Sequence, residues 1–248
     1  MNGELAGRVA IVTGAGRNIG RAIALALADA GAAVVVNGRA DRIAVDAVVA
    51  DIESRSGKAL AAMADVSDEA SVQRMVAAAV ERFGRVDVLV NNAAVRPEKR
   101  FESLSLADWR AVHSVILEGA FLTVQSALPH LKSSGSGAIV NIGGMSAHTG
   151  AKHRAHVIAA KSGLVGFTRA LAHDLAQYGI TANCVVPGLI DTVRASGTVP
   201  QHHLSAKTLA GRFGTPDEIA AAVRFLAGPS ARYITGQAFH VNGGAYLG

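Results

Sequence analysis

Short apolar stretches alternate with amphipathic stretches along almost the whole of this chain. The apolar stretches end in turn-forming residues, which is typical of β-strands, and lie at 8–14, 32–38, 58–66, 86–92, 137–143, 180–188 and 237–244. The amphipathic stretches have the periodicity of helices and lie at about 18–30, 41–56, 68–83, 107–131, 154–178 and 216–227. Strands that are apolar throughout are buried on both faces, so the pattern predicts a parallel sheet with helices on either side.

No stretch of Pro, Gly and Ser divides the 248 residues into two parts. We therefore expect one α/β domain over 1–248, of the doubly wound Rossmann type. The least regular stretch, 189–212, follows the carboxyl end of a predicted strand, where open α/β sheets bind their ligands. We expect this stretch to form a flexible flap over a substrate.

Composition narrows the class of partner. Half of the residues are hydrophobic and 17% are charged, and the net charge of +5 includes no dense run of Lys or Arg. We therefore expect neither nucleic acid nor a membrane as a partner. A single cysteine, Cys184, rules out an internal disulfide and a thiolate metal cluster. Because the sequence begins without a basic stretch, an apolar segment and a cleavage site, we expect a cytoplasmic protein.

The sequence TGAGRNIG at 13–20 follows the first predicted strand and opens the first predicted helix. Gly14 permits a tight turn, and Gly20 allows the helix to pack close to the sheet. The helix N-terminus would then direct free N–H groups and a favourable dipole at a pyrophosphate. A strand, a glycine turn and a helix in this order predict a dinucleotide site.

The end of the second predicted strand indicates which dinucleotide binds. NAD sites usually have Asp or Glu there, which binds the ribose 2′-hydroxyl. This chain has VVVNGR, with Asn37 and Arg39, and Arg17 lies in the glycine loop. Two arginines without a carboxylate suit a 2′-phosphate, so we expect NADP(H) to be preferred, with NAD(H) as the alternative. It also remains open that both arginines are solvated surface residues.

Together these motifs resemble those of the short-chain dehydrogenase/reductase family over nearly the whole chain. TGAGRNIG resembles the family's TGxxxGxG, NNAA at 91–94 its NNAG, and VVPGLIDT at 185–192 its PG motif. ADV at 64–66 and ITGQAFHVNGG at 234–244 resemble its adenine-contacting segment and its closing strand. The family's middle glycine is Asn18 here, and Asn tolerates a left-handed backbone better than other non-glycine residues.

The resemblance implies a seven-stranded parallel sheet, a bound nicotinamide dinucleotide and a homotetramer of 222 symmetry. It also implies which residues hold the dinucleotide. At the glycine loop and the second strand these are Gly14, Arg17, Asn18, Ile19, Gly20, Asn37 and Arg39. Toward the adenine, the ribose and the nicotinamide they are Asp65, Val66, Asn91, Ala93, Lys161, Pro187, Gly188, Ile190 and Thr192.

The family's catalytic pattern is incomplete in this chain. The resemblance implies a tyrosine that transfers a proton, a lysine four residues later, a serine thirteen residues before the tyrosine, and an asparagine on the preceding long helix. Lys161 matches the lysine, because AAKSGLVGFTRALA fits the family helix without a gap. The other three positions are then Val157, Gly144 and Ile116. Three of the four usual catalytic residues are therefore expected to be absent.

Other side chains near these positions are candidates for proton transfer. His153 precedes Val157 by four residues and would share its helix face if the helix begins early. His156 is adjacent to Val157, and Ser146 lies two residues beyond the vacated serine position. Histidine titrates near neutral pH and is a competent acid, although a solvated loop histidine is the commoner finding. The spacing of His148, His153 and His156 matches no metal-ligand motif, so we expect no metal.

The sequence supports two hypotheses about function. In the first, the chain is an NADP(H)-dependent oxidoreductase that acts on a small carbonyl or alcohol substrate through an atypical active site. In the second, it binds a dinucleotide without redox activity, as a sensor or a partner subunit, or catalyses a non-redox reaction in the same pocket. The family resemblance favours the first hypothesis, and the three absent residues favour the second.

Overall fold

All seven predicted strands are present and form one parallel sheet. The computed structural model describes residues 3–192 and 208–248. The strands are β1 (Val9–Val12), β2 (Ala33–Gly38), β3 (Lys58–Met63), β4 (Val88–Asn91), β5 (Ala138–Ile142), β6 (Thr181–Pro187) and β7 (Ala238–Val241). Their order is β3-β2-β1-β4-β5-β6-β7, and every neighbouring pair is parallel. The predicted fold class is confirmed.

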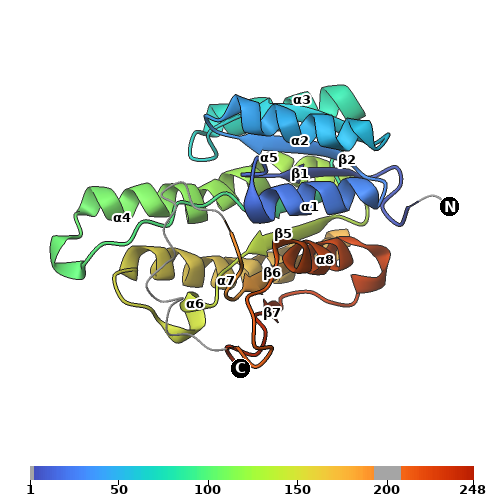
Figure 1. The fold of residues 1–248 in the computed structure, drawn as a ribbon. Helices are drawn as coiled ribbons and strands as arrows, with labels where there is room; N and C mark the ends of the chain where they lie inside the picture. Colours follow the sequence, from blue (N-terminus) through green and yellow to red (C-terminus); the bar gives the residue numbers. More distant parts are fainter. Residues whose placement is uncertain (1–2, 193–207) are drawn as a thin grey trace.

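Helices cover both faces of this sheet (Figure 1). One face carries α1 (Asn18–Asp29), α2 (Arg42–Ser54) and α8 (Pro216–Ala227), which share one hydrophobic cluster with the strands. The other face carries α3 (Glu69–Phe83), α5 (Gly119–Ser133) and α7 (Ala155–Leu175), which share a second cluster. Successive side chains of β1 alternate between the clusters, because strand side chains point to opposite faces: Ala10 and Val12 belong to the first, Ile11 to the second.

The long helix predicted at 107–131 is present but interrupted. It begins as α4 (Leu106–His113), continues through a π-helical segment, η2 (Ser114–Glu118), and ends as α5. By length and composition alone the stretch Leu106–Ser133 would be apolar enough to cross a membrane. Its inward side chains, such as Val124 and Leu131, pack into the hydrophobic core of the sheet's second face. The stretch is therefore a core helix of the fold.

Several short elements escaped prediction, because a single helical turn has too few residues to show a periodicity. They are η1 (Phe101–Ser103), α6 (Ser146–Thr149), η3 (Ala176–Tyr178) and η5 (Pro229–Ala231). The predicted flap at 189–212 lies largely outside the described residues. Its described part begins with buried Leu189 and Ile190, and Ile190 bridges to Gly214.

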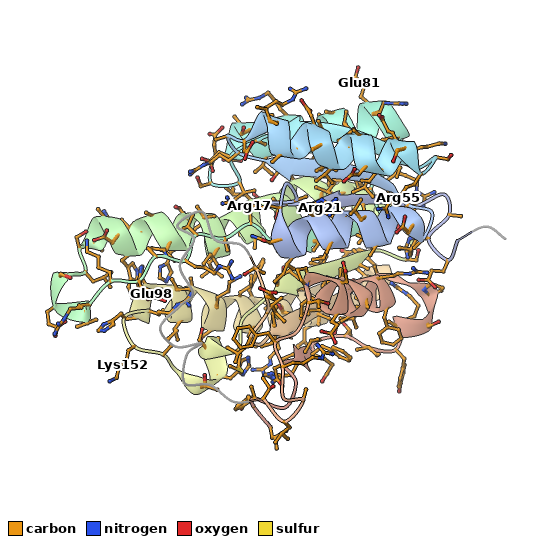
Figure 2. All side chains as sticks on the ribbon, viewed as in Figure 1. Arg17, Arg21, Arg55, Glu81, Glu98 and Lys152 are labelled. Carbon is orange, nitrogen blue, oxygen red and sulfur yellow. The ribbon has the colours of Figure 1, made fainter. Side chains whose placement is uncertain are left out.

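The strand order creates a reversal beside β1. The chain moves outward from β1 to β2 and β3, and then returns to place β4 on the other side of β1. Open α/β sheets bind ligands in the crevice at the carboxyl edge of such a reversal. Figure 2 shows Arg17 at this carboxyl edge, while Arg55, which follows α2, lies at the opposite edge. The site is therefore expected where β1 and β4 end.

Candidate dinucleotide-binding and active site

The turn after β1 has a backbone that two glycines make possible. Gly14 has φ 62°, in the left-handed region, and a Cβ there would lie 3.0 Å from the Cα of Ala93. A Cβ on Gly20 would overlap the carbonyl oxygen of Gly14 and lie 2.6 Å from Nδ2 of Asn92. The first turn of α1 thus approaches the loop as closely as a Rossmann-type phosphate turn requires. A larger residue at Gly14 or Gly20 would push the loop and the first turn of α1 apart.

Asn18 stands where the family pattern has its middle glycine, and it adopts the left-handed backbone with φ 51°. Asparagine is one of the few non-glycine residues that enter this region readily. The loop therefore keeps its path without the glycine. Arg17 precedes Asn18 with extended backbone (φ −157°) and is exposed, while Ile19 is buried in the core.

Hydrogen bonds between the ends of β1 and β4 hold the glycine loop in place. Asn92 donates from Nδ2 to the carbonyl oxygens of Thr13 (2.9 Å) and Gly14 (3.0 Å). The hydroxyl of Thr13 accepts hydrogen bonds from the backbone N–H groups of Asn92 (2.9 Å) and Ala93 (3.0 Å). Hydrogen bonds within the protein therefore fix the shape of the turn. Asn92 lies inside the NNAA motif but was not among the predicted site residues, because the motif does not reveal which asparagine is structural.

Asn37 also supports the loop. Its Oδ1 accepts a hydrogen bond from the N–H of Gly14 (3.2 Å), and its Nδ2 donates to the carbonyl oxygens of Ala62 (3.0 Å) and Ala64 (3.1 Å). The side chain is almost fully buried. Asn37 therefore contributes to the site by fixing Gly14 against β2 and β3, a role that its position in the sequence alone did not suggest.

Charged side chains border the end of β2. Arg39 lies 3.9 Å from the carboxylate of Asp65, with 64% of its side chain exposed. Asp65 accepts hydrogen bonds from the backbone N–H (2.9 Å) and hydroxyl (2.6 Å) of Ser67, which together with Arg39 hold its pKa below the usual range. Arg17 and Arg39 thus remain at the surface, on the side where the predicted 2′-phosphate would lie.

A shallow pocket follows the loop toward the centre of the sheet. It is lined by Thr13, Val66, Asn91, Ala93, Val115, Ile116, Gly119 and Ala120. Val66 and Gly119 are in contact, because a Cβ on Gly119 would lie 2.9 Å from a methyl group of Val66. Val66, Asn91 and Ala93, which were predicted to contact the dinucleotide, therefore share one wall with Ile116.

Asn91 belongs to a buried chain of polar side chains across the sheet. The Thr123 hydroxyl donates to Oδ1 of Asn91 (2.6 Å), and Nδ2 of Asn91 donates to Oδ1 of Asn141 (2.9 Å). Nδ2 of Asn141 then donates to the hydroxyl of Thr168 (2.8 Å). This chain joins α5 to α7 through β4 and β5. Sequence reasoning missed Thr123, Asn141 and Thr168, because only the strand register brings them together.

Lys161 is buried on α7, with 5% of its surface exposed, and its ammonium donates to the carbonyl oxygen of Ile142 at the end of β5. Burial, together with the positive charges of Arg96 and Arg154, lowers the pKa of Lys161 to about 8. Cys184 of β6 is buried nearby, and burial raises its thiol pKa to about 11. Lys161 is therefore held at the carboxyl edge with a proton that it can release near neutral pH.

The positions of the family's tyrosine and asparagine are packed together. Val157 and Ile116, each 2% exposed, belong to one hydrophobic cluster with Val112, Ala120, Ala160 and Leu164. Ile116 lies in the π-helical segment η2, a deviation that is frequent at functional sites. At the serine position, a Cβ on Gly144 would meet no atom within 4 Å. The structure thus has space for a side chain at Gly144.

The candidate proton donors of the helix start have different surroundings. His153 is exposed, has φ 62° and precedes α7, which begins at Ala155, so the idea that an early helix start aligns it with Val157 is wrong. His156 is fully buried, and neither ring nitrogen has a hydrogen-bond partner in the described part of the chain. Burial lowers the pKa of His156, which favours the neutral ring. Ser146 begins α6 and is half-buried.

His148 packs instead toward the C-terminal end of the chain. Its ring lies 4.6 Å from that of His240 and 5.7 Å from that of Tyr246. It is therefore separated in its contacts from His153 and His156. Among the described residues, no group of three or more His, Cys, Asp or Glu side chains could hold a metal ion.

The segment after β6 supplies the last predicted contacts. The carbonyl oxygen of Pro187 accepts a hydrogen bond from the N–H of Met145 (3.0 Å), which ties this segment to the loop after β5. Gly188 donates to Val241 (3.0 Å), and a Cβ there would lie 2.6 Å from Asn242. Ile190 is buried, and Thr192, half-buried, is the last residue before the undescribed stretch. These residues border the same carboxyl edge as Lys161.

A glycine turn at the reversal of a parallel sheet defines a dinucleotide-binding α/β protein of the Rossmann type. A sequence model described as enoyl-(acyl carrier protein) reductase matches residues 14–246. The 3-oxoacyl-[acyl-carrier-protein] reductase of Synechocystis is 42% identical over 244 residues, which cover 98% of both chains. This chain therefore belongs to the short-chain dehydrogenase/reductase family of oxidoreductases.

Other known proteins support the same assignment. A subunit of (2S)-[(R)-hydroxy(phenyl)methyl]succinyl-CoA dehydrogenase from Thauera aromatica is 40% identical, with 97% of each chain covered. The crystal structure of a short chain dehydrogenase from Burkholderia cenocepacia in complex with NADP has a TM-score of 0.91 and 35% identity, over 98% of this chain and 99% of that chain. A dehydrogenase/reductase from Sinorhizobium meliloti has a TM-score of 0.93 and 35% identity, over 98% and 96%.

Proposed function

We propose that the chain is an NADP(H)-dependent oxidoreductase that interconverts a carbonyl and an alcohol through an atypical active site. The observation that carries this proposal is the buried ammonium of Lys161 at the carboxyl end of β5. Arg17 and Arg39, with no acidic residue at the end of β2, support NADP(H) over NAD(H). The Burkholderia relative, whose structure contains NADP, supports the same choice.

The residues of this chain fit the binding of such a dinucleotide. Gly14 and Gly20, at which a Cβ would collide with neighbouring backbone, keep the turn tight against α1, so that the N-terminus of α1 is placed to bind a pyrophosphate. Arg17 and Arg39 would bind the 2′-phosphate, and Asp65 and Val66 would lie beside the adenine. Asn91 and Ala93 would border the ribose, while Pro187, Gly188, Ile190 and Thr192 would line the nicotinamide.

In this proposal Lys161 performs the proton transfer that the family assigns to a tyrosine. When bound, NADPH would supply a hydride to the carbonyl carbon of the substrate. The Lys161 ammonium would hold the ribose and release a proton to the carbonyl oxygen, which becomes the hydroxyl of the alcohol. Its pKa of about 8 suits this role, because an acid with a pKa near the working pH transfers its proton efficiently.

We expect slow turnover, because apart from Lys161 the serine and tyrosine positions offer the substrate oxygen no side-chain proton or hydrogen-bond donor. A positioned general acid contributes about 10²–10⁴-fold, and an oxyanion donor about 10²–10³-fold. Val157 offers no proton and Gly144 no side-chain donor. Ser146, His153 and His156 are secondary candidates, and the complete burial of His156 argues against it as a donor to a substrate.

The pH dependence of carbonyl reduction tests this role of Lys161. Reduction needs the protonated ammonium, so kcat is expected to be constant below pH 8 and to fall about tenfold for each pH unit above it. Lys161→Arg keeps a positive charge that does not titrate in this range, so its residual activity should lose that pH dependence. NADPH affinity is measured in parallel. Activity that is absent in wild type despite NADPH binding would contradict the proposal.

A second function is favoured by the packing of Val157 with Ile116: a dinucleotide-binding subunit without redox activity of its own, whether a sensor, a partner subunit or a protein with a non-redox activity. The Thauera aromatica relative is itself named as a subunit of a dehydrogenase. Restoring the family pattern with Val157→Tyr, Gly144→Ser and Ile116→Asn distinguishes the two. Carbonyl reduction that appears only in this triple variant would favour the binding subunit.

We also propose that the protein forms a homotetramer in the cytoplasm and acts on a small molecule, without nucleic acid or membrane. Phe225 of α8 and Phe239 of β7 are 40% and 37% exposed, and Phe121 of α5 is 46% exposed. Apolar surface of this kind suits contacts between subunits. Light scattering on the purified chain would give the mass of a tetramer, whereas a monomer would contradict this assembly.

A further inference from the structure

The position of Lys161 depends on how α7 lies against β5. Its ammonium donates to the carbonyl oxygen of Ile142, the last residue of β5, although the lysine itself belongs to α7. A shift of the helix along the strand would therefore separate the ammonium from its acceptor. The contacts that fix α7 against β5 thus decide whether Lys161 stays at the carboxyl edge.

One such contact starts at Asn141, the residue before Ile142. Strand side chains alternate between the two faces of a sheet, so Ile142 packs in the cluster of α1, α2 and α8, while Asn141 faces α7. Nδ2 of Asn141 donates to the hydroxyl of Thr168 on α7 (2.8 Å). The same hydroxyl donates to the carbonyl oxygen of Leu164 (2.8 Å). The amide of Asn141 is thereby attached to a hydroxyl whose orientation the helix itself fixes.

Thr168 follows Lys161 by seven residues, which is about two turns of an α-helix. Side chains at this spacing lie on the same face of the helix, within about 20°. Lys161 and Thr168 therefore both face β5, and both are buried, with 5% and 1% exposed. The helix is thus joined to two consecutive residues of the strand, to the side chain of Asn141 and to the carbonyl oxygen of Ile142.

The amide of Asn141 is bonded at its other end to the wall of the candidate pocket. Its Oδ1 accepts a hydrogen bond from Nδ2 of Asn91 (2.9 Å), the residue opposite Asn141 in the register of β4 and β5. Asn91 lines the pocket beside Ile116. Asn141 is fully buried, so both of these bonds need partners within the protein. Asn141 therefore connects the pocket wall with the helix that carries Lys161.

We propose that Asn141 is a positioning residue for the reaction: through Thr168 it holds α7 in the register that keeps the ammonium of Lys161 on its carbonyl acceptor. This inference rests on the oxidoreductase function proposed above, because it names a residue that acts through Lys161. A hydrogen bond to the ammonium favours the charged form. Weakening the attachment of α7 should therefore make Lys161 release its proton at a lower pH.

Thr168→Val breaks this attachment with little change of side-chain shape. We expect the pH above which kcat for carbonyl reduction falls to move down by about one pH unit, the effect of weakening a hydrogen bond to a charged group. Thr168→Ser keeps a hydroxyl at this position and should restore the pH dependence of the wild type. Circular dichroism checks that each variant is folded.

Thr123→Val is the matched control, because Thr123 is an equally buried threonine at the opposite end of the same polar chain. Its hydroxyl donates to Oδ1 of Asn91 (2.6 Å) and belongs to α5 rather than α7. The same replacement of a hydroxyl by a methyl group should leave the pH dependence of kcat unchanged. If the polar chain only stabilises the fold, both valine variants should behave alike.

A double variant keeps the test decisive if Thr168→Val does not fold. Asn141→Leu combined with Thr168→Val removes both ends of the bond, so that no polar group of this pair is left buried without its partner. The double variant should show the same downward shift of the pH dependence. An unchanged pH dependence in the folded double variant would overturn the proposal.

The other charges that act on Lys161 stay in place in these variants. Among the described residues they are Arg96 in the loop after β4, Arg154, which precedes α7 and is 4% exposed, and Cys184 of β6. The Cys184 thiol also interacts with the Thr168 hydroxyl, which Thr168→Val removes. Burial raises the pKa of this thiol to about 11, so it is neutral near the pH of the test and adds no charge beside Lys161.

A direct titration separates the positioning role from the reaction. In protein labelled with ε-¹³C lysine, the NMR signal that Lys161→Arg removes reports the protonation of Lys161 without any turnover. If no carbonyl is reduced, the reductase function fails, but a lower pKa of Lys161 in Thr168→Val and not in Thr123→Val still supports the positioning role. Equal pKa values of Lys161 in the two valine variants would overturn that role, whether or not the protein is a reductase.

Discussion

At the scale of single residues, the dinucleotide loop depends on asparagines as much as on glycines. Asn18 takes the left-handed backbone, Asn37 holds the N–H of Gly14, and Asn92 holds the carbonyl oxygens on the other side. An amide side chain both donates and accepts, so it satisfies a loop whose backbone groups face several directions. Arg17 and Arg39, by contrast, remain at the surface, where they are available to a ligand.

Arg39 is expected to select NADPH over NADH. It is 64% exposed and lies 3.9 Å from Asp65, so its loss should hardly alter stability. Arg39→Gln should weaken NADPH binding about 10- to 100-fold and leave NADH binding unchanged, because only NADPH carries the 2′-phosphate. Separate titrations with NADPH and with NADH, each followed by the fluorescence of the reduced cofactor, would measure the two affinities. Arg42→Gln, which removes an exposed arginine paired with Asp46 at 2.8 Å, is the control.

If Arg39→Gln weakened both cofactors equally, the arginine would contribute general attraction rather than selection. If it weakened neither, Arg17 would be the remaining candidate for the 2′-phosphate. The sequence indicated a preference for NADP(H) because cofactor choice depends on the residues at the end of one strand, which are contiguous in the chain. It could not predict that Arg154 is buried, since that depends on how the loop after β4 packs against α7.

At the scale of secondary structure elements, the sequence was most informative where a pattern is long. The six long helices and seven strands predicted from hydrophobic periodicity are all present in the described part of the chain. The π-helical segment η2 was not predictable, because one extra residue in a single turn barely changes the periodicity of a helix. The start of α7 at Ala155 was also uncertain, and this uncertainty alone made His153 a candidate for the face of Val157.

Helix α8 offers a prediction about its start. Thr215 and Glu218 form a capping box, in which the N–H of Thr215 donates to Glu218 (2.8 Å) and the N–H of Glu218 donates to the Thr215 hydroxyl (3.4 Å). Thr215→Ala removes one of these bonds and should lower the free energy of unfolding by about 1 kcal/mol. Urea unfolding would measure the loss.

Ser133→Ala is the control for this prediction, because its hydroxyl donates to the carbonyl oxygen of Pro129 (2.9 Å) near the end of α5 and caps no helix start. It should change stability by less than about 0.5 kcal/mol. An equal loss in both variants would mean that the cap of α8 contributes nothing specific. A smaller loss for Thr215→Ala would mean that Arg212, which bonds Glu218 at 2.7 Å, already fixes the helix start.

At the scale of the whole molecule, the two edges of the sheet have different tasks. The carboxyl edge carries the candidate site. The amino edge is fastened by Asp87, a buried carboxylate that accepts hydrogen bonds from the N–H of Val9 (2.9 Å) and from the guanidinium of Arg85 (2.6 and 2.8 Å). The guanidinium of Arg8 also donates hydrogen bonds at this edge, to the carbonyl oxygens of Ser136 (2.5 Å) and Ala227 (2.9 Å).

Asp87→Ala is expected to destabilise the fold without affecting the site. It leaves the N–H of Val9 without its partner and frees Arg85, so the free energy of unfolding should fall by about 2–4 kcal/mol. NADPH affinity, measured under conditions where the variant is fully folded, should not change. Asp46→Ala, which breaks an exposed pair, should cost less than about 1 kcal/mol. A large loss of NADPH affinity in Asp87→Ala would show that the two edges are coupled.

The reversal of the sheet beside β1 has a consequence for how such a chain changes over time. The turn at Gly14 is supported by β1, β2 and β4, whereas Val157 and Lys161 are carried by α7 beside β5. Substitutions on α7 at positions other than Lys161 can therefore accumulate while nucleotide binding persists. A duplicated gene could therefore encode a protein that still binds its coenzyme while the residues on α7 change. Such a protein could acquire a different substrate without first losing coenzyme binding.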